Sequence, residues 1–243
     1  MAVRIISIIS ACLLLCYIVF ASVFFKDTKQ HDICRELVVI VKDSLDKHFV
    51  TNADLVSFLK QAKLNPIGQP MNTVNTHEIE TALLKNEMIA SVEAYKTPSG
   101  IIKLEVKQKI PILRVIGSDG NFYIDNKGSI MPVSRRYVAH VPVASGQIER
   151  KLAMGDLYQF ALFLQEDAFW NNQIEQIYVY PNKDIVLIPR VGDHRILLGG
   201  FDDFRDKLSN LQLFYKQVVP KMGWEKYSII NLRFKNQIVC TKK

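Results

Sequence analysis

Motifs for metal binding and nucleophilic catalysis are missing from this sequence of 243 residues. No histidine has a second ligand at the spacing that zinc sites use; the five are His31, His48, His77, His140 and His194. The chain also lacks a glycine-rich phosphate loop and a G-x-S-x-G element around a nucleophilic serine. These absences argue against an enzyme, and we expect no catalytic residue, no metal, no cofactor and no small-molecule substrate.

Adjacent carboxylates are the remaining candidates for acid–base chemistry. Asp202-Asp203 and Glu166-Asp167 both fall at the ends of predicted helices, where capping and solvation explain them. Asp125 stands beside Asn126 and Gly128, a combination that favours a turn. None of these carboxylates is assigned a catalytic role.

Cysteine is scarce, with four in the chain. Cys12 and Cys16 lie one helical turn apart in an apolar N-terminal stretch, where small apolar packing explains them. Cys34 and Cys240 lack the spacing of a zinc or redox motif. A disulfide between Cys34 and Cys240 stays open at this stage, but one pair in a large domain is no disulfide framework.

A run without charge occupies residues 5–25 and reads IISIISACLLLCYIVFASVFF. As a helix it would be about 30 Å long, which is enough to cross the hydrocarbon core of a bilayer. A cleaved signal peptide has a shorter apolar core and a small-x-small site, and the apolar run before Cys12 is too short for a lipoprotein signal. We therefore predict a transmembrane helix at residues 5–25. With Arg4 as the only charged side chain before it, the positive-inside rule leaves residues 1–4 in the cytoplasm and exports the rest.

The net charge of +7 is concentrated towards the C-terminus. Residues 190–243 hold 11 basic and 5 acidic side chains. An exported membrane protein seldom meets nucleic acid, so we expect no nucleic-acid partner. The basic end favours an acidic protein partner or an anionic polymer, and a solvated basic surface is the alternative.

A polar link at residues 26–35 leads into a predicted β-α-α-β-β unit at residues 36–107. Leu37–Val41 is an apolar run typical of a strand buried on both faces. Helix-start signals at residues 51–54 and 75–78 each precede apolar residues at helical spacing.

Two predicted strands complete this unit. Residues 89–96 and the strand after Gly100 are joined by a turn, and Ile102, Leu104 and Val106 alternate with charged residues. This order lays two helices on one face of a small sheet.

Residues 108–243 are predicted to form a second, strand-rich unit. FYIDNKGSIMPVS, at residues 122–134, predicts a hairpin whose Gly128 takes a positive φ. HVPVASG, at residues 140–146, is interpreted as a connector. The remaining predicted elements are a helix from about Asp156, strands at Ile174–Tyr180, Asp184–Ile188 and His194–Leu198, a helix capped by Asp202 or Asp203 and ended by Pro220 and Gly223, and a last strand at Ser228–Thr241. The predicted fold class is α+β, with a transmembrane helix, a β-α-α-β-β domain and a mixed β-sheet domain with two helices.

This arrangement resembles the bacterial cell-division family FtsQ, called DivIB in some lineages. Residues 36–107 are similar to its POTRA domain, and residues 108–243 to its β-domain. FYIDNKG resembles the family's F-Y-x-I-D-x-x-G hairpin, HVPVASG its connector, and INLRF its closing V-D-L-R-Y/F strand. The chain departs from the pattern at Asn231, where aspartate is common, and in its short cytoplasmic tail.

The resemblance implies a non-enzymatic division scaffold in the cell inner membrane at the septum, with its C-terminal domains in the periplasm. It implies binding to division proteins resembling FtsB and FtsL, contacts with other division proteins through the POTRA-like domain, and a part in controlling septal peptidoglycan synthesis. It places partner binding on the last strand, at Asn231, Leu232, Arg233, Phe234, Lys235, Gln237, Ile238 and Val239.

Arg233 would pair with a partner carboxylate and Phe234 would supply an apolar anchor. The alternative is an internal ion pair for Arg233 and a core position for Phe234. Two other functions stay open: a POTRA-bearing export or assembly factor that binds client polypeptides, and an envelope hydrolase or peptidoglycan-binding enzyme.

Overall fold

A computed structural model describes residues 13–21, 33–42 and 49–243. These residues form two compact units. The first takes in the described residues up to Ile40, with Asn52–Leu83 and Val92–Val106. The second comprises the described residues of Val41–Thr51, Leu84–Ser91 and Lys107–Lys243.

Residues 13–21 are helical, and residues 13–20 are exposed. They are the described part of the predicted span at residues 5–25. Residues 5–12 and 22–25 lie outside the described residues, as does the predicted tail at residues 1–4. In the ranges that are described, no helix combines the length and the apolar character that crossing a membrane requires.

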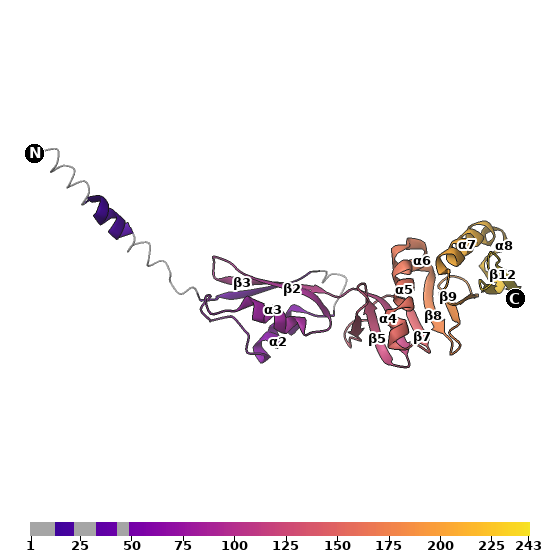
Figure 1. The fold of residues 1–243 in the computed structure, drawn as a ribbon, viewed down its shortest axis with the longest axis horizontal. Helices are drawn as coiled ribbons and strands as arrows, with labels where there is room; N and C mark the ends of the chain where they lie inside the picture. The colour runs from indigo at the N-terminus through magenta and orange to yellow at the C-terminus, as the bar shows by residue number, and fades with distance from the viewer. Residues whose placement is uncertain (1–12, 22–32, 43–48) are drawn as a thin grey trace, which may run out of the picture. The chain divides into compact units, whose positions relative to one another are not determined.

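The three-stranded sheet carries two helices, in the β-α-α-β-β order that the sequence predicts (Figure 1). Its strands lie in the order β1-β3-β2. Ile102, Leu104 and Val106 of β3 are fully buried, and the Asn75 side chain accepts a hydrogen bond from the backbone N–H of Glu78 at 3.3 Å. The elements are β1 (Glu36–Lys42), α2 (Asn52–Gln61), α3 (Thr76–Leu84), β2 (Ile89–Lys96) and β3 (Ile101–Gln108).

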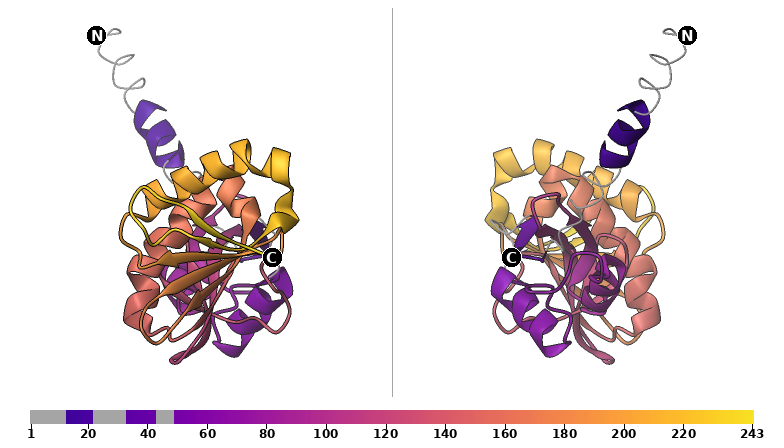
Figure 2. Two further views of the ribbon diagram at one scale, coloured as in Figure 1. Left: turned by 90° about the vertical axis from the view of Figure 1, so that its right-hand side faces the viewer. Right: turned by 90° about the vertical axis from the view of Figure 1, so that its left-hand side faces the viewer.

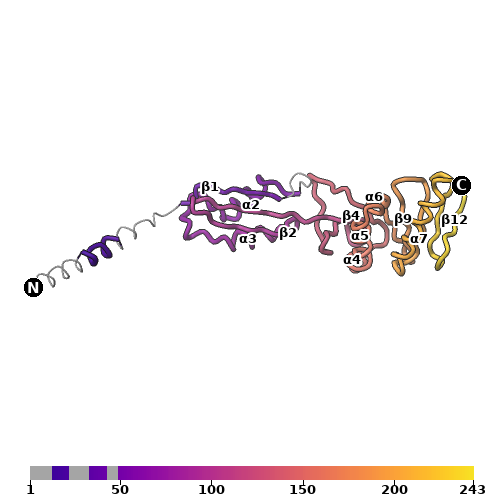
Figure 3. The backbone as a smooth tube through the Cα atoms, turned by 90° about the horizontal axis from the view of Figure 1, so that it is seen from above, coloured from indigo at the N-terminus to yellow at the C-terminus, as the bar shows by residue number. Residues whose placement is uncertain are grey.

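Strand β1 is more exposed than its apolar run predicts. Val41 is buried, but Ile40 is 41% exposed, and Leu37 to Val39 are only half-buried. The prediction of a strand buried on both faces is therefore wrong. β1 is an edge strand of this sheet, so it lacks the flanking strand that shields a central one. The tube in Figure 3 shows β1 at the margin of its unit.

A mixed nine-stranded sheet forms the second unit in the described chain, in the order β12-β11-β10-β9-β8-β7-β4-β5-β6. The pairs β4–β7, β7–β8 and β10–β11 are parallel, and the other neighbours are antiparallel. The strands are β4 (Pro111–Gly117), β5 (Gly120–Asp125), β6 (Ile130–Pro132), β7 (Val143–Gly146), β8 (Ile174–Val179), β9 (Ile185–Pro189), β10 (Arg195–Gly199), β11 (Tyr227–Asn231) and β12 (Val239–Lys242).

The helices of this unit are more numerous than the two that were predicted. They are α4 (Arg150–Met154), α5 (Asp156–Glu166), α6 (Ala168–Gln173), α7 (Phe204–Gln217), α8 (Val219–Met222) and a 3-10 turn at Trp224–Lys226. Helices α4, α6 and α8 have four to six residues, which is too short for an apolar period to be recognised. Pro220 does not end the helical segment, because proline is tolerated in the first turn of the separate helix α8.

The predicted hairpin is confirmed as β5–β6, and Gly128 has a φ of 78°. Asp125 takes the predicted turn role, since one of its carboxylate oxygens accepts hydrogen bonds from the backbone N–H of Lys127 and of Ser129. The predicted connector at residues 140–146 instead supplies β7, a central strand between β4 and β8. Its Ala144 is fully buried, whereas its four residues are too few for a clear period of two.

One apolar core joins the helices to one face of the large sheet. Leu157 and Phe160 of α5 and Leu208 and Leu211 of α7 are fully buried in it with the inward side chains of the strands. On the opposite face Tyr178 is 38% exposed. Figure 2 shows α7 and α8, in yellow-orange, beside the end of the sheet that contains the C-terminal strands.

Candidate partner-binding edge

The last predicted strand, Ser228–Thr241, is two strands in the structure. β11 and β12 pair antiparallel, and residues 232–238, here called the edge loop, join them. The Asn231 side chain accepts a hydrogen bond from the backbone N–H of Arg233 at 3.0 Å, which turns the backbone out of the strand. Asn236 has a φ of 58°, in the left-handed region that asparagine tolerates. The single long strand was therefore a wrong prediction.

Strand β12 forms one edge of the nine-stranded sheet, and β11 is its neighbour in the described chain. The backbone N–H of Lys243 donates to the carbonyl of Lys226, on the side of β11. Because backbone groups alternate sides along a strand, the N–H groups of Cys240 and Lys242 point to the open side. Such an edge can accept an additional strand.

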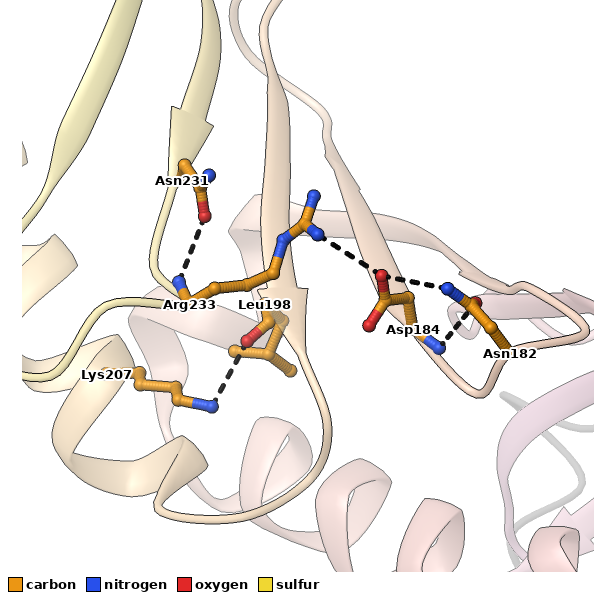
Figure 4. A network of polar contacts seen from close by, with 6 residues as sticks. All are labelled: Asn182, Asp184, Leu198, Lys207, Asn231 and Arg233. Atoms are coloured by element: carbon orange, nitrogen blue, oxygen red, sulfur yellow. Dashed lines mark hydrogen bonds and ion pairs between the residues drawn. The ribbon is translucent and has the colours of Figure 1, made fainter.

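Arg233 already has a partner within the chain. Its Nη1 lies 3.3 Å from Oδ2 of Asp184, and the Asn182 side chain donates to the same carboxylate at 3.2 Å (Figure 4). Both side chains of the ion pair are partly exposed, so the pair contributes at most about 1 kcal/mol to stability. The predicted alternative of an internal ion pair thus describes Arg233 in this structure.

Phe234 lies on the surface and is 52% exposed, so the alternative of a core position is wrong for it. Leu232, in contrast, is a core residue with 2% exposure. The remaining residues of the predicted set lie on the surface along the edge loop and the start of β12: Lys235, Gln237 and Val239 are exposed, and Ile238 and Asn231 are half-buried. The structure thus gathers the predicted set at one end of the sheet edge.

A groove of about 190 Å³ lies between the edge loop and the start of α7. Sequence reasoning assigned Asp202 or Asp203 to capping α7, but Asp203 stands at the cap position with a φ of 53° and its side chain makes no cap hydrogen bond. The available signal was the cluster of three aspartates at the start of the predicted helix, Asp202, Asp203 and Asp206. The lining residues that the prediction missed are Asp202, Asp203, Asp206, Lys207, Asn210 and Asn236.

An aromatic cluster around His194 supports this corner of the fold. His194 is 3% exposed, and its Nε2 shares a 2.6 Å hydrogen bond with the Tyr215 hydroxyl of α7. Trp224 stacks on the imidazole with an interplanar angle of 12°. Lys243, directly after β12, forms ion pairs with Asp193 at 3.2 Å and with Glu225 at 2.8 Å.

Burial sets the protonation of this cluster. It lowers the pKa of His194, while the nearby Glu225 carboxylate acts in the opposite direction. Burial also raises the pKa of Tyr215 well above its ordinary value, so its hydroxyl stays protonated.

Cys34, Cys240 and the helical Cys16 are free thiols.

A family profile described as FtsQ/DivIB, C-terminal related, matches residues 110–241, which is more than half of the chain and runs from β4 to all but the last residue of β12. The chain belongs to the FtsQ/DivIB family. A profile for a POTRA-like domain matches residues 32–107. The α+β fold, with a POTRA-like domain followed by a mixed sheet with helices, agrees with this membership.

Two individual proteins resemble this FtsQ/DivIB chain. Cell division protein FtsQ of Rhodothermus marinus is 25% identical over 179 residues, which cover 68% of this chain and 64% of that protein. The match therefore spans less than two thirds of the relative. The solved extracytoplasmic domain of the cell division protein DivIB from Geobacillus stearothermophilus aligns with 47% of this chain and 97% of its own length, at 16% identity and a TM-score of 0.32.

Acid should destabilise this FtsQ/DivIB fold through His194. Because burial holds the pKa of folded His194 below the ordinary value of 6.5, the unfolded chain takes up a proton that the folded chain resists. The stability that neutral His194 provides is present above about pH 6.5 and is lost as the pH falls below it. Each pKa unit by which the folded value lies below the unfolded value corresponds to about 1.4 kcal/mol in the free energy of unfolding. Urea unfolding at about pH 7.5 and about pH 5.5 measures this loss.

Two glutamine variants separate His194 from the other titrating groups. His194→Gln should lose less free energy of unfolding between the two pH values than the parent chain. His140→Gln, which changes an exposed histidine, should lose as much as the parent. An unchanged pH dependence in His194→Gln would contradict the assignment.

Proposed function

We propose that this FtsQ/DivIB chain is a non-enzymatic scaffold of the bacterial division machinery. The observation that supports it most directly is the open edge of β12, which, apart from Lys242, lies within the part of the chain that matches the family. An edge of this kind binds a partner through backbone hydrogen bonds, with neighbouring side chains setting the register. The function therefore rests on holding other proteins together at a surface.

The proposed partners are division proteins resembling FtsB and FtsL, and one of them adds a strand to β12. The exposed Phe234 supplies apolar contact area next to that strand. We further propose that the β-domain comprises residues 108–243 and that the POTRA-like domain, residues 36–107, contacts other division proteins. Through these contacts the chain takes part in controlling septal peptidoglycan synthesis.

The proposed location is the cell inner membrane at the division septum. The uncharged run at residues 5–25 would be the single transmembrane anchor. Residues 1–4 would lie in the cytoplasm, and both folded domains in the periplasm.

Membrane fractionation and co-purification test the scaffold and its anchor together. We expect the tagged full-length chain to stay in the membrane fraction after a carbonate wash, because an apolar helix of this length partitions into the bilayer. Detergent extraction and affinity purification should then recover FtsB-like and FtsL-like division proteins. A variant lacking residues 1–25 should be released from the membrane. Recovery of outer-membrane assembly clients instead of division proteins would contradict the scaffold function.

A further inference from the structure

The groove beside the edge loop continues along α7 and changes character on the way. Asn210, Asn236 and Ile238 line both the first groove and a shallower hollow of about 490 Å³, so the two are continuous. Leu213, Phe214 and Val218, at the later turns and C-cap of α7, line the hollow together with the polar Gln217, and Leu213 is 54% exposed there. Phe234 contributes a second exposed apolar side chain on the loop side.

The end near the start of α7 offers negative charge to a ligand. It is lined by Asp202, Asp203 and Asp206, and none of these carboxylates has a hydrogen-bond or ion-pair partner within the described ranges. Two of the three basic residues that line this groove have partners within the chain, and the third, Lys235, is exposed on the edge loop. Lys207 Nζ donates to the carbonyls of Leu198 at 3.1 Å and Gly200 at 3.4 Å, and Arg233 pairs with Asp184. Figure 4 shows Lys207 pointing to the carbonyl of Leu198 and Arg233 pointing to Asp184.

The groove adjoins the edge of the sheet directly. Ile238 lines the groove, and the next residue, Val239, begins β12. A strand added to β12 would therefore have one of its ends at the groove, whichever direction it ran. The chain of that partner must continue past this end of β12, where the groove offers apolar surface and unpaired carboxylates.

We propose that the segment flanking the partner's added strand binds in this groove, and that it is basic and apolar. This inference rests on the proposed function. A lysine or arginine of the partner lies opposite Asp202, Asp203 and Asp206, and apolar side chains of the same segment pack on Leu213 and Phe234. Desolvation at such a contact strengthens the attraction between opposite charges. The charge proposed for this segment is opposite to that of an acidic partner segment paired with Arg233, because Arg233 is already engaged by Asp184.

Charge reversal in the full-length chain tests the groove. The double variant Asp202→Lys with Asp206→Lys should bind the co-purifying FtsB-like protein about tenfold more weakly at low salt, because opposite charges become like charges. The difference should shrink at high salt, where exposed charges are screened. The matched control is Asp156→Lys with Glu166→Lys on α5. Asp156, like Asp206, lies in the first turn of its helix, so the control suffers the same loss of helix-dipole stabilisation.

Crosslinking identifies the occupant. A photo-crosslinking residue at Leu213 should capture the FtsB-like protein, whereas the same residue at Met154, which is 49% exposed on α4, should not. Capture of a second copy of this chain at position 213, or equal binding by the reversed and control variants at low salt, would overturn the groove proposal. Lys242→Pro separates the groove proposal from the strand addition on which it rests. Binding lost in Lys242→Pro but kept by the reversed variant refutes the groove alone, while binding kept in both refutes the strand addition as well.

Discussion

Lys242→Pro should abolish capture of the strand-adding partner, whereas Lys242→Ala should leave capture unchanged. The alternation along β12 directs the Lys242 backbone N–H to the open side, where an added strand would accept a hydrogen bond from it. Proline removes this donor and places its ring in the path of the incoming strand. A backbone hydrogen bond left unmade at an interface costs about 1–3 kcal/mol, which corresponds to a loss of about fivefold to 150-fold in affinity.

The alanine variant isolates the backbone effect, since it removes the exposed lysine side chain and keeps the N–H. Proline is tolerated in edge strands, so both variants should melt close to the parent protein. Pull-down from detergent-solubilised membranes measures capture. If the proline and alanine variants retained equal amounts of the FtsB-like protein, strand addition on β12 would be refuted.

Gly146→Ala should destabilise the second unit by about 3–5 kcal/mol, because it combines an unfavourable backbone conformation with a steric overlap. Gly146 ends the central strand β7 with a φ of 107°, and a Cβ there would overlap the carbonyl oxygen of Val179 on β8. Neither neighbour can move freely, since Gly146 and Val179 are paired in the sheet and the Val179 carbonyl accepts a hydrogen bond from Gln147 at 2.9 Å.

Two other glycines separate the causes. Gly120 has a φ of 118° and open space around the added Cβ, so Gly120→Ala should show only the conformational cost, about 1–3 kcal/mol. The φ of Gly117 is not in the left-handed region, but an added Cβ would overlap the carbonyl of Ile148. Gly117→Ala therefore measures the cost of the steric overlap alone. Urea unfolding of the three variants should rank Gly146→Ala lowest. A Gly146 variant as stable as the Gly120 variant would show that the sheet relaxes around the added methyl group.

Periodicity and turn chemistry predicted the elements that carry a clear local signal. The alternation of Ile102, Leu104 and Val106 identified a strand with one buried face, and the residues around Gly128 identified the hairpin. In these segments the local preference and the tertiary packing agree, so the sequence pattern was sufficient.

The failures lie where tertiary position decides the outcome. Nothing within Leu37–Val41 indicates that the strand lies at a sheet edge. Likewise, nothing within residues 140–146 indicates that four of them form a strand paired between β4 and β8. At the candidate site, INLRF was recognised but its backbone turn at Asn231 was not, because the apolar residues on both sides favour one continuous strand. The acidic side of the groove comes from the start of α7 and the two residues before it, more than twenty residues before the edge loop, and only the fold brings the two together.

The four-residue length of β12 limits self-association of the protein when no partner strand is bound. An open sheet edge that accepts one strand can in principle accept the same edge of another copy, which is a common route to aggregation. β12 limits this hazard in two ways. It is short, and it carries the exposed Lys242, so two copies brought edge to edge would bring like charges close together. A strand with so few ladder positions holds little affinity by itself, and a true partner is distinguished from a second copy by what it contacts beyond the edge.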